Sequence, residues 1–126
     1  MKAWIPLILA VTVCAAAHSQ STCNYPTAPV TPPDGATATK EQMVAANKDY
    51  GRYNTEMNAY LDCLKAEMDA GTPKDASKLS PEEKKKIDDK QKILVQKSNA
   101  AVDELQAAVG RFNEQLKIYK AKLQKS

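Results

Sequence analysis

Apolar and aromatic residues recur at alternating spacings of three and four through the middle of the chain. The residues concerned are Met43, Ala46, Tyr50, Tyr53, Met57, Tyr60 and Leu64. This spacing repeats one face of a helix every seven residues and is typical of a coiled-coil seam. Thr39 and Gln42 match a capping box, and Gly71 followed by Pro73 supplies a stop. The pattern therefore predicts a helix over residues 40–70.

A second seam with the same alternation occupies the last third of the chain. It consists of Val95, Ser98, Val102, Leu105, Val109, Phe112, Leu116, Tyr119 and Leu123, with Ile87 and Leu94 leading into it. Ser80 is a suitable cap, Pro81 fits the first helical position, and Glu83 completes another capping box. We expect a second helix over residues 81–124.

The connection between these segments, residues 71–79, is short enough to fold the two helices back on each other. The expected fold class is therefore all-α, a coiled-coil-like antiparallel hairpin over residues 39–125. Folding about residue 75 would set Met57 opposite Leu94 and Tyr50 near Ala101. At 1.5 Å per residue the second helix would extend beyond the first by about 20 Å, at the end that carries Phe112 and Leu123.

Residues 20–38 differ in composition and carry four prolines before an Asp34-Gly35 turn. The prolines are Pro26, Pro29, Pro32 and Pro33. Proline fixes φ and removes backbone donors, so we expect an extended arm rather than a domain.

Residues 1–19 have the pattern of a secretory signal peptide. Lys2 precedes an apolar run from Trp4 to Ala17, which ends in small and polar residues. Cleavage after Ala17 and cleavage after Ser19 both fit the pattern, and acylation of Cys14 is an alternative. Removal of the segment would take the only Trp and, we expect, the only His. The predicted location is the periplasm or the exterior of the cell.

Cys23 and Cys63 are the two cysteines left in the mature chain, and we expect them to form a disulfide in an oxidising compartment. An arm of about 3.1 Å per residue can run back along the first helix and reach Cys63. An intermolecular bridge is the alternative. A redox dithiol and a metal site are disfavoured, because the cysteines lie forty positions apart and no histidine accompanies them.

Composition disfavours enzymatic chemistry and nucleic-acid binding. Seventeen Lys and Arg against fifteen Asp and Glu remain once Lys2 is removed, a balance too even to indicate a polyanionic partner. Without histidine, no Ser-His-Asp set can form. No phosphate loop, haem motif or metal-ligand spacing is present, so we predict a non-enzyme without cofactor.

The last turns of the second helix combine exposed apolar side chains with positive charge. We predict an interaction surface there, formed by Phe112, Leu116, Lys117, Tyr119, Lys120, Lys122 and Leu123. A basic amphipathic end of this kind suits anionic lipid or an acidic partner, although cations also complement the helix dipole at this position. The tyrosines on the seams could stack against a ligand, but their positions favour the core.

Three short motifs resemble a pattern found in small exported proteins of Gram-negative bacteria. They are Cys23-Asn24-Tyr25-Pro26, Pro33-Asp34-Gly35-Ala36-Thr37 and Tyr60-Leu61-Asp62-Cys63. The resemblance covers residues 23–64 and implies periplasmic export and a bridge between Cys23 and Cys63. That group has no assigned activity, so the likeness implies no catalytic residue.

These observations favour an exported structural or protein-interaction module of the bacterial envelope, whose protein partner the sequence does not identify. Peripheral binding to anionic lipid is the alternative. Two helices bury little apolar surface, so we also expect self-association into a four-helix arrangement.

Overall fold

The computed structural model describes residues 22–125, and this part of the chain is helical with no strand. Helix α1 spans Lys40–Gly71, a short 3₁₀ helix η1 spans Ala76–Lys78, and helix α2 spans Pro81–Gln124. The predicted signal peptide and its cleavage sites lie outside the described residues. Within residues 22–125, no helix is both long and apolar enough to cross a membrane.

Both long helices begin at the residues that their capping boxes predict. Thr39 Oγ1 accepts from the Gln42 amide at 3.2 Å, and Gln42 Oε1 accepts from the Thr39 amide at 2.8 Å. Ser80 and Glu83 form the same pair of bonds, at 3.2 and 2.8 Å. Each box satisfies two amides that a helix start would otherwise leave without partners. The observed bounds differ from the expected ones by one residue, at Gly71.

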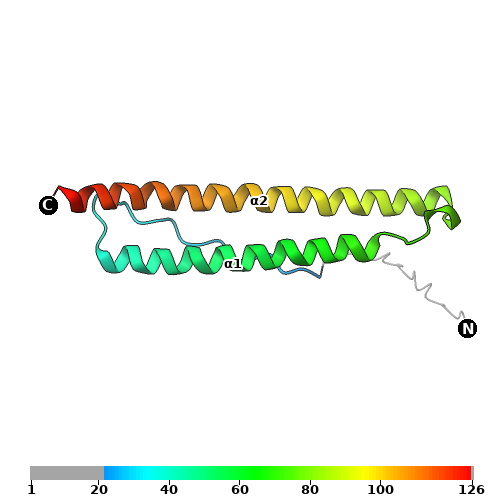
Figure 1. Cartoon of the computed structure of the whole chain (residues 1–126), viewed down its shortest axis with the longest axis horizontal. Helices are drawn as coiled ribbons and strands as arrows, with labels where there is room; N and C mark the ends of the chain where they lie inside the picture. The colour runs from blue at the N-terminus through cyan, green and yellow to red at the C-terminus, as the bar shows by residue number, and fades with distance from the viewer. Residues whose placement is uncertain (1–21, 126) are drawn as a thin grey trace, which may run out of the picture.

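The two helices pack together along their length as a helical hairpin, with the start of α1 beside the last third of α2 (Figure 1). All seven seam residues of α1 are buried. Helix α2 contributes Leu94, Ala101, Ala108 and Phe112 to the same core. The core thus lies mainly between α1 and α2, and Ala38, just before α1, completes it.

The face of α2 that meets α1 is rotated by about one residue from the expected seam. Val95 and Val102 were expected in the core, yet they are 46% and 37% exposed, whereas the preceding heptad row, with Ala101 and Ala108, is fully buried. The bulk of the α1 tyrosines explains the difference, because two backbones approach closely over large rings only where the facing residues are small. Phe112 lies beside both rows on the helix surface and is buried as expected of a seam residue.

The pairing along the helices is also displaced from the prediction. Tyr50 was expected near Ala101 but stacks on Phe112, with ring centroids 4.9 Å apart. Near the other end of α1, Gln91 Nε2 donates to the Met68 carbonyl at 2.9 Å. The connection with η1 and the first turns of α2 lie beyond the end of α1 (Figure 1), so the chain folds near residue 80 rather than 75. Helix α2 therefore extends beyond α1 at both ends of the hairpin, and not at one end as expected.

Candidate functional site

The arm, residues 22–38 of the described chain, is joined at its start to the second half of α1. Cys23 and Cys63 form a disulfide with a Cα–Cα distance of 5.7 Å, which confirms the predicted intramolecular bridge. The Thr22 amide and hydroxyl both donate to Glu67 Oε1 at 2.8 Å. The hydrogen bonds to Glu67, one turn further along α1, therefore help the disulfide to hold the start of the arm.

Tyr25 links the arm to both helices. Its ring meets Tyr60 edge-on at 5.0 Å, and its hydroxyl donates to Glu104 Oε2 at 2.7 Å. Tyr53 donates to the other oxygen of Glu104 at 3.3 Å, so one α2 carboxylate holds both hydroxyls. Burial, followed by the hydrogen bond to Glu104, raises the pKa of Tyr25. Burial, followed by the charge of Glu104, raises the pKa of Tyr53.

The middle of the arm is bonded to the first half of α1. The Val30 amide donates to Asp49 Oδ2 at 3.0 Å, and the Tyr50 hydroxyl donates to the Val30 carbonyl at 2.9 Å. Hydrogen bonds from Arg52, and then from the Val30 amide, lower the pKa of Asp49. Both polar backbone groups of Val30 are thus satisfied by α1 side chains.

The turn at the end of the arm packs directly on the backbone of α2. The Gly35 amide donates to Gln115 Oε1 at 2.9 Å. A Cβ at position 35 would overlap the Gln115 carbonyl oxygen and lie 2.8 Å from the Tyr119 nitrogen. Lys122 Nζ donates to the Ala38 carbonyl at 2.7 Å. The arm therefore requires glycine here because of close approach, and not because of a left-handed backbone.

The structure divides the predicted interaction surface into two parts. Phe112 is buried against Tyr50, as expected of a seam residue. Leu116 and Tyr119 are half-buried against the core, so the expectation of exposed apolar side chains is wrong for these two. The reason is that α1 and the arm reach further along α2 than expected. Lys122 lies over the Tyr119 ring, 4.9 Å from its centroid. Exposed members of the predicted set are Lys117, Lys120 and Leu123.

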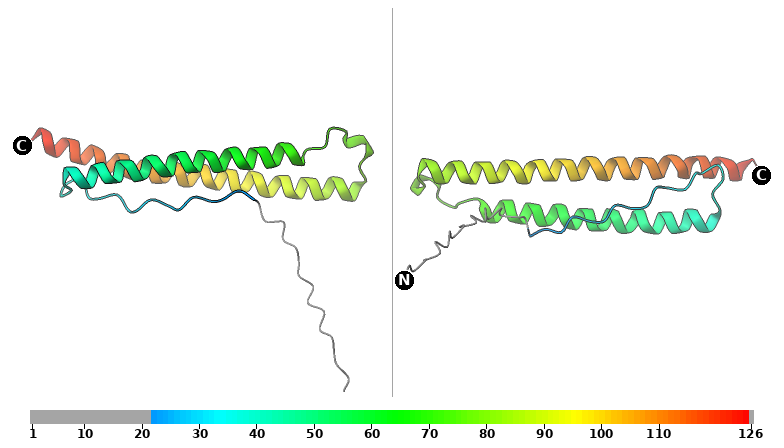
Figure 2. Two further views of the ribbon diagram at one scale, coloured as in Figure 1. Left: turned by 90° about the horizontal axis from the view of Figure 1, so that it is seen from below. Right: turned by 180° about the vertical axis from the view of Figure 1, so that it is seen from behind.

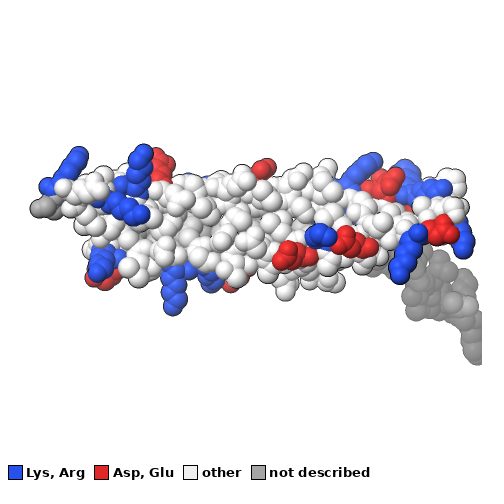
Figure 3. Space-filling view, viewed as in Figure 1, with Lys and Arg blue, Asp and Glu red and all other residues white. Residues whose placement is uncertain are grey.

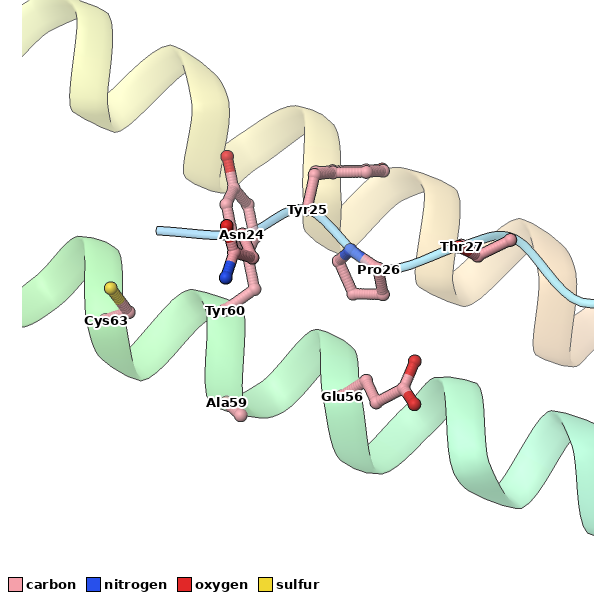
Figure 4. Close-up of a pocket in the computed structure, with 8 residues that line it drawn as sticks. All are labelled: Asn24, Tyr25, Pro26, Thr27, Glu56, Ala59, Tyr60 and Cys63. Carbon is pink, nitrogen blue, oxygen red and sulfur yellow. The ribbon is translucent and has the colours of Figure 1, made fainter. Parts of the chain in front are cut away.

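Among the shallow hollows on the described residues, two lie at the start of the arm and at the basic end of α2. One lies between the arm and α1 (Figure 4) and is lined by Asn24, Tyr25, Pro26, Thr27, Glu56, Ala59, Tyr60 and Cys63. The other lies on the last turns of α2 and is lined by Asn113, Leu116, Lys117, Lys120, Ala121 and Gln124. Both are open to solvent, which suits contact with a macromolecular surface better than enclosure of a small ligand.

Among the described residues, one group of potential metal ligands lies together, formed by Cys23, Cys63 and Glu67 within 4.8 Å of one another. The two sulfurs are bonded to each other, so they are not thiolate ligands. This group holds the arm in place in the oxidised protein.

Sequence reasoning missed the arm contacts made by Glu104, Asp49 and Glu67, because no local pattern shows which carboxylate faces the arm. The close approach of Gly35 had a partial sequence signal in the Asp34-Gly35 turn. No family model, curated protein or solved structure matches this chain.

Proposed function

We propose that this chain is an exported, non-enzymatic helical module that presents a fixed surface to a protein partner in the bacterial envelope. Its working form is an antiparallel, coiled-coil-like hairpin with an extended proline-rich arm tethered across it. The predicted signal peptide of residues 1–19 and the resemblance of residues 23–64 to small exported proteins support this location. The disulfide suits an oxidising compartment such as the periplasm or the exterior.

The observation that carries the proposal is the continuous anchoring of the arm. A disulfide at Cys23 and hydrogen bonds at Tyr25, Val30, Gly35 and Ala38 hold it against α1 and α2. Bonds to both helices prevent them from sliding or separating, so the remaining faces keep one shape. A rigid scaffold with open hollows is suited to recognition, since little conformational entropy is lost on binding.

In vivo cross-linking followed by affinity capture from the envelope tests this function. The expected result is one partner that cross-links to the intact protein and is lost with a Cys23→Ser/Cys63→Ser variant. Capture of nothing beyond background by the intact protein would contradict the proposal.

Peripheral binding to anionic lipid is the second candidate, and the exposure of Lys117, Lys120 and Leu123 favours it. Two cations beside an apolar side chain can sit at a headgroup boundary. Vesicles containing phosphatidylglycerol test it, and binding should fall steeply as salt is raised.

The variant for this test is Lys117→Glu/Lys120→Glu, which spares Lys122 because that side chain bonds to Ala38. Lys84→Glu/Lys86→Glu makes the same charge change at the other, exposed end of α2 and is the matched control. Equal binding of the two variants would remove the lipid hypothesis.

A further inference from the structure

One heptad row of α2 is apolar and partly exposed along most of the helix. This open stripe consists of Val95, Val102, Val109, Leu116 and Leu123. Val95 and Leu123 at its ends are 46% and 56% exposed. At 1.5 Å per residue the stripe is about 42 Å long. The open stripe is exposed because α2 is rotated from the expected orientation, which turns the row with Ala101 and Ala108 toward α1 in its place.

The open stripe faces away from the arm. The arm bonds to α2 through Glu104, Gln115 and Lys122, which form one row about 140° around the helix from the stripe. Seen from behind, the arm crosses in front of α1 (Figure 2, right), so Figure 3 shows the opposite face. On that face charged side chains lie toward both ends and along α1, and the middle of α2 is largely uncharged (Figure 3). The hairpin thus has one covered groove and one open apolar side.

We propose that a second copy of this chain covers the open stripe, with the two α2 helices packed antiparallel about a two-fold axis near Leu105 and Gln106. In this alignment Val102 faces Val109 of the second copy, and Val95 faces its Leu116. The two-fold axis repeats each contact, so Val95, Val102, Val109 and Leu116 of both copies are buried together, and Leu123 lies at the end of the contact opposite Asp88.

Charge complementarity favours this occupant and alignment. Asp88 lies one heptad before Val95 in the same row of α2. The alignment places Asp88 within one turn of Lys120 of the second copy, and the two-fold axis repeats this pair at the other end of the contact. Both side chains are exposed, and neither has an ion pair among the described residues.

The residues that flank the stripe are also self-complementary. Asn99, Gln106 and Asn113 follow the stripe on its solvent side. Their amides can both donate and accept hydrogen bonds, so identical rows can pair across the axis. Gly110 on the same side has open space around it, which permits close approach of a second helix.

The contact area is sufficient for a dimer. The alignment overlaps the α2 helices over about 37 residues, or about 55 Å, and a contact strip about 10 Å wide then buries roughly 1,000 Å² in total. This value is close to the threshold of about 1,000 Å² for a biological interface and below the range of about 1,200–2,000 Å² typical of stable complexes, so we expect a weak, reversible dimer.

This inference rests on the proposed function as an interaction module and names its partner as a second copy. Sedimentation equilibrium of the oxidised protein should show a monomer–dimer equilibrium. Val102→Glu should weaken the dimer by at least about tenfold, because it places a charge in the apolar contact. Ile93→Glu is the matched control, since Ile93 is 53% exposed on the same helix but points away from the stripe, and it should leave the dimer unchanged.

A charge exchange tests the alignment itself. Lys120→Asp should weaken the dimer by about threefold to tenfold, and Asp88→Lys/Lys120→Asp should restore it. A wild-type monomer at all concentrations, or a dimer unaffected by Val102→Glu, would overturn the inference. Failure of the exchange to restore the dimer would overturn the antiparallel alignment. A monomeric wild type that still captures an envelope protein would leave the proposed function standing.

Discussion

The two ends of the hairpin are stabilised in different ways. The strapped end, residues 22–64 with residues 94–122, contains every buried residue of the described chain. The connection end, residues 65–93, contains none. Beyond the hydrogen bonds of Gln91 to Met68 and of Thr22 to Glu67, it is held mainly by exposed ion pairs three or four positions apart, such as Lys65–Asp69 and Lys85–Asp89. The comparison shows that the same helical pattern can depend on tertiary packing at one end and on local bonds at the other.

Removing the disulfide should have the largest effect, and it should act on the strapped end. Cys23→Ser/Cys63→Ser opens a loop of about 41 residues, which the chain-entropy model values at about 4 kcal/mol. Urea unfolding followed by circular dichroism measures the loss. A loss below about 1 kcal/mol would show that the hydrogen bonds of the arm suffice without the bridge. Dithiothreitol supplies the control, because it should destabilise the wild type and leave the variant unchanged.

Gly35→Ala should have the next largest effect. The new methyl group would overlap the α2 backbone at Gln115, so the turn must move away, at a cost of about 1–3 kcal/mol. Gly51→Ala is the matched control on α1, where nothing lies within 4 Å of the added atom. It should stabilise the protein by about 0.5–1 kcal/mol through helix propensity. Equal effects of the two substitutions would show that the arm turn does not pack on α2 in solution.

The elements of this fold could be predicted because their determinants are local. Thr39, Gln42, Ser80 and Glu83 set the helix starts through contacts three residues apart. The bridge was accessible as well, since chain length alone shows that Cys23 can reach Cys63. These predictions needed no knowledge of how α1 and α2 face each other.

The alignment of the helices could not be predicted from the same information. The Val102 row and the Ala101 row of α2 both repeat every seven residues, and they share Phe112 and Leu105 as neighbours on the helix surface. Hydrophobicity favours the valines, but the space required by the large side chains of α1 favours the alanines. Such a choice depends on the shape of the opposite helix, which a pattern along one chain does not contain.

The sequence located only part of the candidate interaction surface, because that surface also depends on how α1 and α2 face each other. The sequence places Lys117, Lys120 and Leu123 correctly in an exposed region, because the end of a helix is seldom covered. It gave no indication that the arm turn would bond to Lys122 or that α1 would reach Phe112. Those contacts follow from the fold point near residue 80.

Ser80→Ala should affect the connection end alone. The substitution removes the hydroxyl that accepts from the Glu83 amide, and loss of an N-cap costs about 1 kcal/mol. Hydrogen exchange should show faster exchange in the first turns of α2, with protection near Ala101 retained. Thr39→Ala is the counterpart at the strapped end, where the neighbouring Ala38 also bonds to Lys122. If Ser80→Ala also lowered protection at Ala101, the two ends would be one cooperative unit.

Raising the pH into the alkaline range should have the smallest effect, and at the strapped end it should act through the tyrosine hydroxyls that bond to Glu104. Folding raises the pKa of Tyr25 and Tyr53, chiefly through burial, so the folded state holds these protons more tightly than the unfolded chain does. The stability from the Glu104 contacts is therefore complete below the ordinary tyrosine pKa of about 10 and decreases as pH rises above it. Tyrosinate absorbance together with circular dichroism should show arm release before loss of helix. A Glu104→Gln variant keeps hydrogen-bond acceptance without the charge, and it should shift the release to higher pH. Simultaneous loss of both signals would show that the arm and the helices separate in a single step.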